Sequence, residues 1–250
     1  MTDQPSFDKP PSEPAFNIPA AVVVLGAVMI AVHAVRSLVL TQDQDIYTVL
    51  LFAFLPVRYD PERLAGLILP GGAGADVWTF LSYAVLHGGS AHLAFNLLWM
   101  VVFGSAVARR FGAIRFVLFS ALCAVAGAGA HLLTHFGEPI PMVGASAAIS
   151  GHMAAASRFV FELGGPLGVI RRSDPSAYRV PAVSLIESLA NRQVLAFLLV
   201  WFGVNILFGL WSSPLAGAGS TIAWEAHIGG FLAGLLLFAV FDPIPRRSSL

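Results

Sequence analysis

The sequence predicts an all-α polytopic membrane protein built as a bundle of six membrane-spanning helices. Apolar residues make up 57% of its 250 residues and charged residues only 11%, whereas soluble domains carry about 25% charged residues. The mean hydropathy is +0.78. So few charges could not cover a water-facing surface, which excludes a soluble enzyme. Six apolar runs are also long enough to cross about 30 Å of hydrocarbon.

The charge balance argues against a nucleic-acid-binding protein. Fourteen Lys and Arg balance fourteen Asp and Glu, so the chain has no general basic field, and we expect no nucleic-acid partner. A single cysteine, Cys123, excludes a disulfide framework and a Cys-rich metal site. Thirteen of the fourteen basic residues are Arg, which together with abundant Ala and Gly suggests a bacterial genome rich in G and C.

The N-terminal region predicts a tail followed by a first span. Residues 1–16 hold four prolines and little apolar content, which is typical of a disordered tail. The membrane domain is expected over residues 17–241. Its first apolar run, 18–40, is not followed by a small-residue cleavage site, so we expect this span to be retained.

Loops and further spans follow in order. A long loop, 41–91, is predicted to contain an amphipathic helix over 46–57 and a turn at the Gly-rich run 71–74. Its Leu, Phe and Trp content indicates a position partly in the membrane interface. Further spans are predicted over residues 92–108, 113–133, 145–163, 193–212 and 222–241. A loop over 164–192 precedes the fifth span, and the tail 242–250 ends the sequence.

The basic residues predict the orientation of the bundle. With a cytoplasmic N-terminus, eleven of the fourteen lie on the inner side, and the short outer loops 134–144 and 213–221 hold none. The positive-inside rule therefore places both termini in the cytoplasm, which agrees with six spans. We expect a multi-pass protein of a bacterial inner membrane, in contact with the lipid bilayer.

Polar residues at membrane depth are costly, so each one is a candidate functional residue. Ser146 opens the fourth span, where backbone N–H groups have no helical partner. This position suits a nucleophile that needs an adjacent anion site. Small residues nearby, among them Gly144 and Gly151, would let a neighbouring helix approach closely. The alternative is that Ser146 only bonds back to a carbonyl in a packed helix.

The last span carries a second group of candidates. Ala226, Gly230 and Gly234 form a small-residue face, with His227 at its edge. If this face meets the helix of the serine, the imidazole reaches the hydroxyl. The alternative is a histidine bonded to a backbone carbonyl. Asn205, midway along the fifth span, is expected to make an interhelical hydrogen bond.

Two further pairs of polar residues have helical spacing. His92 and Asn96 lie one turn apart on one face, and two side-chain donors suit a developing oxyanion, although capping and packing explain them equally well. His131 and His135 are also one turn apart, with Glu138 nearby. That group could bind a metal, but no third histidine is fixed close by, so we expect no metal and no cofactor.

Taken together, these motifs resemble the rhomboid intramembrane serine proteases over about residues 76–240. The His-x4-His-x3-Asn pattern of the family is matched by His87, His92 and Asn96. Its Gly-x-Ser motif is matched by Gly144 and Ser146, and its Ala-His-x2-Gly-x3-Gly motif by Ala226, His227, Gly230 and Gly234. The six spans and the long first loop also match.

The resemblance implies that Ser146 is the nucleophile and His227 the general base of a Ser–His dyad. It further implies an oxyanion site made by Asn96, His92 and the backbone N–H of Ser146. No Asp or Glu lies where it could orient the imidazole, because Glu225, two residues from His227, points elsewhere on a helix. The implied substrates are single-span membrane proteins whose helix unwinds near the outer surface.

The chain departs from the family pattern at three positions. Ala147 stands where the family usually has Gly, Thr79 where it often has Arg, and Ser150 where some members have Tyr. These changes affect the expected rate and specificity rather than activity. One alternative is a catalytically inactive rhomboid-like protein that binds membrane clients, although such relatives typically lack the serine or the histidine. A transporter or channel would show internal repeats or a charged pathway, which we do not find.

Overall fold

The structure is a computed structural model that describes residues 17–66, 68–168, 174–210 and 223–245. The predicted tail 1–16, the outer loop 213–221 and the end of the tail 242–250 therefore lie outside the described residues. In the described part the chain is helical, and its extended pairing is one antiparallel bridge between Phe54 and Met142.

Four helices of the described residues are long and apolar enough to cross a membrane. They are α1 (Ala20–Leu38), the segment Ser90–Phe111, α7 (Ala113–Thr134) and α11 (Trp224–Phe241). The second of these consists of α5 (Ser90–Trp99), the π-helical turn η3 (Met100–Gly104) and α6 (Ser105–Phe111). A further apolar helix, α10, spans Arg192–Leu210. The all-α polytopic membrane fold is confirmed, and the count of six spans stays a prediction.

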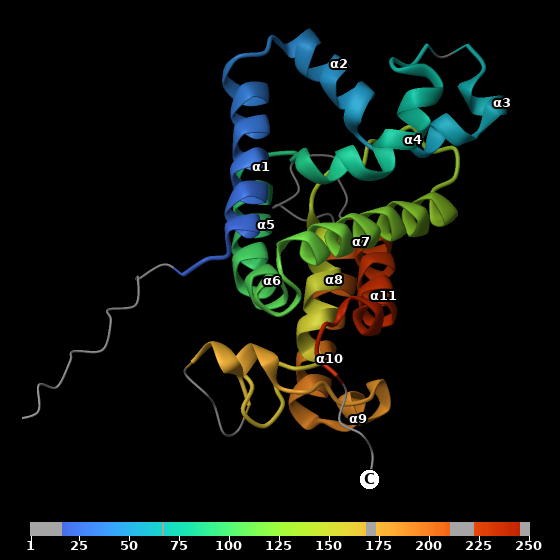
Figure 1. Ribbon diagram of the computed structural model, residues 1–250. Coiled ribbons are helices and arrows are strands. Elements are labelled where there is room, and N and C mark those ends of the chain that lie inside the picture. Colours follow the sequence, from blue (N-terminus) through green and yellow to red (C-terminus); the bar gives the residue numbers. More distant parts are fainter. Residues whose placement is uncertain (1–16, 67, 169–173, 211–222, 246–250) are drawn as a thin grey trace, which may run out of the picture.

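The fourth predicted span is shorter than its apolar run. Helix α8 covers Ser146–Ser157, not 145–163, because the chain leaves the helix in turns from Arg158 onward. Residues 147–157 of α8 are all buried, and Figure 1 shows α8 in the middle of the bundle. A helix surrounded by protein does not need the length that lipid would require of it.

Helices α8 and α11 approach each other at backbone distance. A Cβ atom added to Gly234 would lie 2.5 Å from the carbonyl oxygen of Gly151, and one added to Gly230 would overlap the carbonyl oxygen of Ala147. Only glycine fits at these positions without moving a backbone. The predicted small-residue face of α11 therefore packs against the helix that carries Ser146, with Ala226 buried in the first turn of α11.

The long first loop contains more helix than predicted. Helix α2 spans Gln42–Phe52 rather than 46–57, because a capping box of Thr41 and Gln44 starts it earlier and η1 (Pro56–Tyr59) replaces its end. Helix α3 (Pro61–Leu64) and helix α4 (Gly72–Ser82) follow, and η2 (Tyr83–Val85) leads to α5. The Gly-rich run was predicted as a turn; in the structure Gly71 caps α4 at φ 89° and the helix continues from there.

The described part of the second loop, 164–168 and 174–192, lies at the end of the bundle away from the first loop (Figure 1). It contains η4 (Pro175–Arg179) and α9 (Leu185–Ala190). Arg110 at the end of α6 forms a buried ion pair with Asp242, at 2.8 Å. The same guanidinium donates to the carbonyl oxygens of Tyr178 and Val180, at 3.0 and 2.8 Å. One buried arginine thus joins this loop to the ends of α6 and α11.

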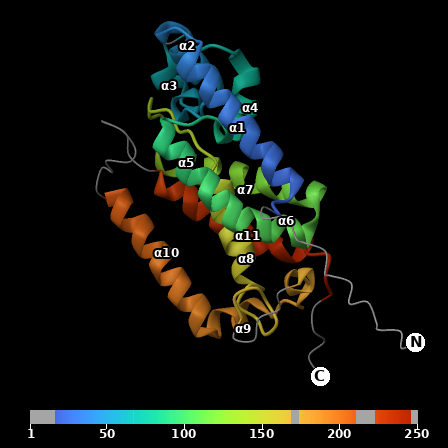
Figure 2. The same ribbon diagram turned by 90° about the vertical axis from the view of Figure 1, so that its left-hand side faces the viewer.

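Helix α10 stands to one side of the other long helices (Figure 2). It meets α11 through the stacked rings of Trp201 and Phe231, whose centroids are 4.4 Å apart. It meets the second span through Phe197 and Phe103, at 5.6 Å. Aromatic packing therefore carries much of the contact between α10 and the bundle.

Candidate active site

Ser146 is the first residue of α8 and its hydroxyl faces His227. The two atoms Ser146 Oγ and His227 Nε2 are 2.8 Å apart. Helix α11 brings the imidazole to the hydroxyl because its glycines allow close packing on α8. The bond to the imidazole is the arrangement expected of an activated nucleophile. It differs from the alternative in which the serine only bonds back to a carbonyl.

The other ring nitrogen of His227 is held by Asn205. Nδ1 of His227 lies 2.6 Å from Oδ1 of Asn205 on α10. The amide nitrogen of Asn205 donates to the carbonyl oxygen of Trp201 at 2.8 Å, so the oxygen is the atom left to face the ring. An amide oxygen only accepts. The network therefore assigns the hydrogen to Nδ1 and leaves Nε2 with a lone pair toward Ser146.

This contact confirms the expected interhelical hydrogen bond of Asn205, but the sequence did not identify its partner. Asn205 and His227 are 22 residues apart on different helices. The available signal was a single amide in an apolar run, which indicates a polar partner without naming it. Glu225, by contrast, faces His135, with Oε1 3.9 Å from Nε2, in agreement with its predicted direction away from His227.

Gly144 shapes the turn that leads into α8. Its φ is +121°, a conformation that other residues rarely adopt. A Cβ atom here would lie 2.7 Å from both Cε1 and Nε2 of the His92 ring. Glycine therefore lets the imidazole of His92 lie against the backbone two residues before Ser146.

His92 and Asn96 lie on α5 and line the same cavity as Ser146. Nδ1 of His92 accepts a long bond of 3.5 Å from the backbone N–H of Gly88, which leaves Nε2 as the donor nitrogen. The amide nitrogen of Asn96 donates to the carbonyl oxygen of His92 at 2.9 Å. Because an amide nitrogen carries two hydrogens, one remains available.

His87 precedes α5 and supports His92 from the loop. The centroids of the two rings are 5.2 Å apart, at an interplanar angle of 67°. Burial away from water, assisted by the neighbouring His92, lowers the pKa of His87 to about 3. The ring is therefore neutral at ordinary pH and packs against His92 without repelling it.

These groups open into one large cavity of about 1030 Å³. Its walls include Phe95 and Trp99 of α5 on one side and Phe197, Trp201 and Val204 of α10 on the other. The polar groups lie at one end, where α5, α8 and α11 all begin. An apolar cavity with convergent polar groups is typical of a binding or catalytic site.

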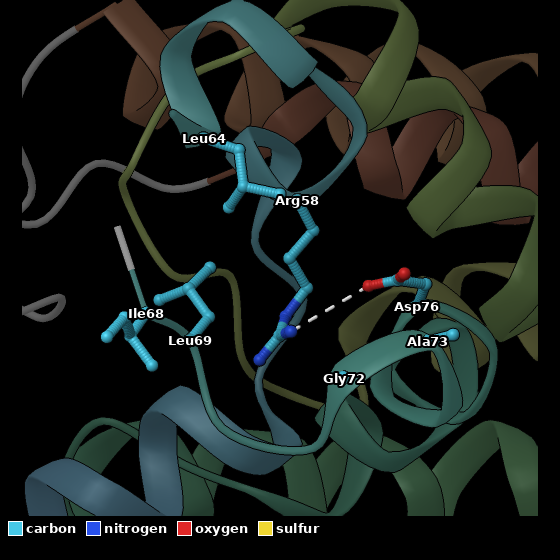
Figure 3. Close-up of a pocket in the computed structure, with 7 residues that line it drawn as sticks. All are labelled: Arg58, Leu64, Ile68, Leu69, Gly72, Ala73 and Asp76. Atoms are coloured by element: carbon cyan, nitrogen blue, oxygen red, sulfur yellow. Dashed lines mark ion pairs between the residues drawn. The ribbon is translucent and has the colours of Figure 1, made fainter. Parts of the chain in front are cut away.

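A second pocket of about 340 Å³ lies in the first loop (Figure 3). Arg58 is its central charge: it donates to the carbonyl oxygens of Leu50 and Pro70, at 2.6 and 2.8 Å, and lies 3.7 Å from a carboxylate oxygen of Asp76. These contacts of the guanidinium stabilise the first loop. The pocket contains no pairing of nucleophile and base.

The three positions that depart from the family pattern have structural partners. Thr79 is buried in α4 and donates to the carbonyl oxygen of Ala75 at 2.6 Å. Ser150 donates to the carbonyl oxygen of Ser146 at 2.8 Å. Ala147 lines the cavity while packing with Ala124 and Ala128 of α7. Their effect on rate and specificity stays a prediction.

The fold and the cavity define a polytopic helical membrane protein with a serine and a histidine paired at one end of the bundle. The chain belongs to the rhomboid family: the Rhomboid domain model matches residues 74–243.

The chain is similar to bacterial proteins named rhomboid proteases. The chain is 40% identical over 182 residues to the rhomboid protease GluP of Bacillus subtilis (strain 168), which covers 71% of this chain and 28% of GluP. It is 24% identical over 201 residues to the rhomboid protease GlpG of Enterobacter sp. (strain 638), which covers 80% of this chain and 61% of GlpG. The chain thus spans less than two thirds of either relative.

Proposed function

We propose that this protein is an intramembrane serine endopeptidase in which Ser146 is the nucleophile and His227 the general base. The 2.8 Å contact between Ser146 Oγ and His227 Nε2 carries the proposal. It is supported by the bond from His227 Nδ1 to Asn205, which leaves Nε2 able to accept a proton. The similarity to rhomboid proteases supports the same assignment.

Hydrolysis proceeds in two halves. Ser146 Oγ attacks the carbonyl carbon of the scissile bond while its proton moves to His227 Nε2. The imidazolium then gives that proton to the leaving amine, and an acyl-enzyme remains. Water, activated by the same imidazole, releases the acyl group and restores the serine. Asn205 acts through His227 as a positioning residue, in the place where other serine hydrolases use a carboxylate.

The oxyanion is stabilised by three donors around the serine. They are the backbone N–H of Ser146 at the start of α8, Nε2 of His92 and the free hydrogen of the Asn96 amide. Backbone N–H groups in a first helical turn have no helical partner, and all three donors border the cavity. Fixed donors in a site with little water stabilise developing charge more strongly than water does.

The substrate is a membrane protein with a single transmembrane segment. The cavity lies between α5 and α10, whose aromatic and aliphatic side chains form its walls. A helical segment protects its peptide bonds by internal hydrogen bonds. Segments with Gly or Pro that unwind at low cost are therefore preferred, and cleavage takes place near the membrane surface where the polar groups lie.

The cellular setting follows from the charge distribution. We place the domain 17–241 in a bacterial inner membrane, with the tails 1–16 and 242–250 in the cytoplasm and the loop 41–91 on the outer side. The main alternative is a catalytically inactive member that binds membrane clients. The contact between Ser146 and His227 favours the protease.

A serine-directed phosphonate probe tests the proposal. We expect purified protein to be labelled on Ser146 and to cleave a transmembrane substrate, and Ser146→Ala to do neither. Ser157→Ala is the matched control: Ser157 ends the same helix and donates to the carbonyl oxygen of Ala154, at 2.8 Å, remote from the cavity. Folding of each variant is checked by thermal melting in detergent. Cleavage by purified Ser146→Ala would refute the assignment.

A further inference from the structure

We propose that His131, His135 and Glu225 form a binding site for a divalent transition-metal ion of the zinc type in the wall of the catalytic cavity. The ligand atoms of the three side chains lie within 4.8 Å of one another. All three residues line the cavity. The site is distinct from the serine and histidine that carry the proposed proteolysis.

The carboxylate of this site comes from Glu225 and not from Glu138, the residue that the sequence placed near the two histidines. Glu138 is close to His135 in the chain, but the cluster is completed by Glu225, 90 residues further on. Oε1 of Glu225 lies 3.9 Å from Nε2 of His135. The last turn of α7, the residue that caps it and the first turn of α11 thus supply the three groups together.

One of the two histidines, His135, has a hydrogen-bond partner that can orient it as a ligand. Thr134 directs its hydroxyl hydrogen to the carbonyl oxygens of Ala130 and His131, at 3.2 and 3.1 Å. Its oxygen is then the acceptor for Nδ1 of His135, at 2.8 Å. In the tautomer with the hydrogen on Nδ1, Nε2 keeps a lone pair on the side that faces Glu225. A second partner that fixes the ring in this way is typical of metal-bound histidines.

His131 is the buried member of the cluster. Its side chain is only 7% exposed, and Nδ1 has no hydrogen-bond partner among the described residues. Its ring stacks on that of His135, with centroids 4.2 Å apart. Buried polar atoms are normally satisfied, and a metal bound through Nδ1 would supply the partner that this atom lacks among the described residues.

The donor set selects the kind of ion. Two imidazoles and one carboxylate suit zinc, with the fourth position open to the cavity. Magnesium and calcium prefer oxygen ligands. Zinc ligands at about 2.0–2.2 Å from the metal lie roughly 3.4 Å apart, so the side chains must close by about 1.5 Å or less. His135 and Glu225, at 27% and 14% exposure, have room to turn. Bound metal would join α7 to α11 two residues before His227.

Zinc titration of purified, untagged full-length protein in detergent tests the proposal by calorimetry and by thermal melting. We expect one Zn²⁺ per chain, a higher melting temperature with Zn²⁺, and no comparable effect of Mg²⁺. Glu225→Gln and His135→Gln should each weaken Zn²⁺ binding on the order of 100-fold. Loss of a residue that only supports a metal ligand costs about 10- to 100-fold, and the loss of a ligand itself should reach at least the upper end of that range. Both side chains are partly exposed, so these variants keep the fold, which melting without metal verifies.

Two matched controls make the result specific. Glu138→Gln removes the same chemical group from the same cavity outside the cluster. His33→Gln removes a histidine of α1 that bonds to Ser90. Both should bind Zn²⁺ as the unaltered protein does. Absence of saturable Zn²⁺ binding, binding that survives in Glu225→Gln, or an equal loss in Glu138→Gln would overturn the site. None of these readouts depends on proteolysis.

Discussion

Asn205 Oδ1 lies 2.6 Å from His227 Nδ1, and this one contact between α10 and α11 assigns both nitrogens of the proposed general base. The amide cannot turn over without losing its bond to the carbonyl oxygen of Trp201. A neutral amide thus takes the place that a carboxylate holds in a Ser–His–Asp triad. It orients the ring without bringing a second charge into an apolar cavity.

Replacement of Asn205 tests this role. Asn205→Leu keeps the approximate volume but removes the acceptor, so kcat should fall about 10- to 100-fold, as expected for the loss of one bond of roughly 1.5–3 kcal/mol. KM should change little, because the ring does not bind substrate. Asn205→Asp retains an acceptor oxygen and should recover part of kcat. The measurement is steady-state cleavage of a transmembrane substrate, with melting as the check on folding. Wild-type kcat in Asn205→Leu would show that the contact is only structural.

Asn96 is proposed as an oxyanion donor. Asn96→Ala should lower kcat by about 10²–10³, the range for the loss of one such donor, while the melting temperature changes little. A smaller fall is expected if His92 and the Ser146 N–H compensate. If Asn96 only packs, stability falls instead and the folded fraction keeps its activity. Phosphonate labelling of Ser146 provides a second measurement, because the oxygen of the adduct occupies the same place.

The close approach of α8 and α11 predicts a sharp difference between two glycines. Gly230→Ala forces a methyl group onto the carbonyl oxygen of Ala147 and should destabilise the fold by about 1–3 kcal/mol. Gly203→Ala, on α10, meets no atom within 4 Å and should be neutral or stabilise by up to about 1 kcal/mol. Thermal melting of both variants in detergent measures the difference. Equal melting temperatures would contradict the packing.

The orientation of the bundle is open to a reporter experiment. A reporter fused after Leu250 should be active in the cytoplasm, and one inserted within 134–144 should report the outer side, as the distribution of Arg and Lys requires. The reverse pattern would move the proposed cleavage site to the cytoplasmic surface.

Much of the site could be predicted because its residues lie in short local patterns. The Gly-x-Ser turn and the small-residue face beside His227 are each readable within nine residues. The partners that come from distant segments could not be found in this way. Asn205 and Glu225 meet their histidines only when α10 and α11 pack. The predicted length of α8 was too long, because hydropathy does not distinguish a helix buried in protein from one in lipid.

Helix α10 contributes to the wall of the cavity and also to the chemistry inside it. A displacement that moves α10 away from α11 would lengthen the contact between Asn205 and His227. The imidazole then loses the acceptor that keeps its hydrogen on Nδ1, and Nε2 is no longer reserved for the serine. A movement of α10 would therefore affect the width of the cavity and the orientation of the proposed general base together. Helix α10 thus couples the shape of the cavity to the hydrogen-bond network around the proposed nucleophile.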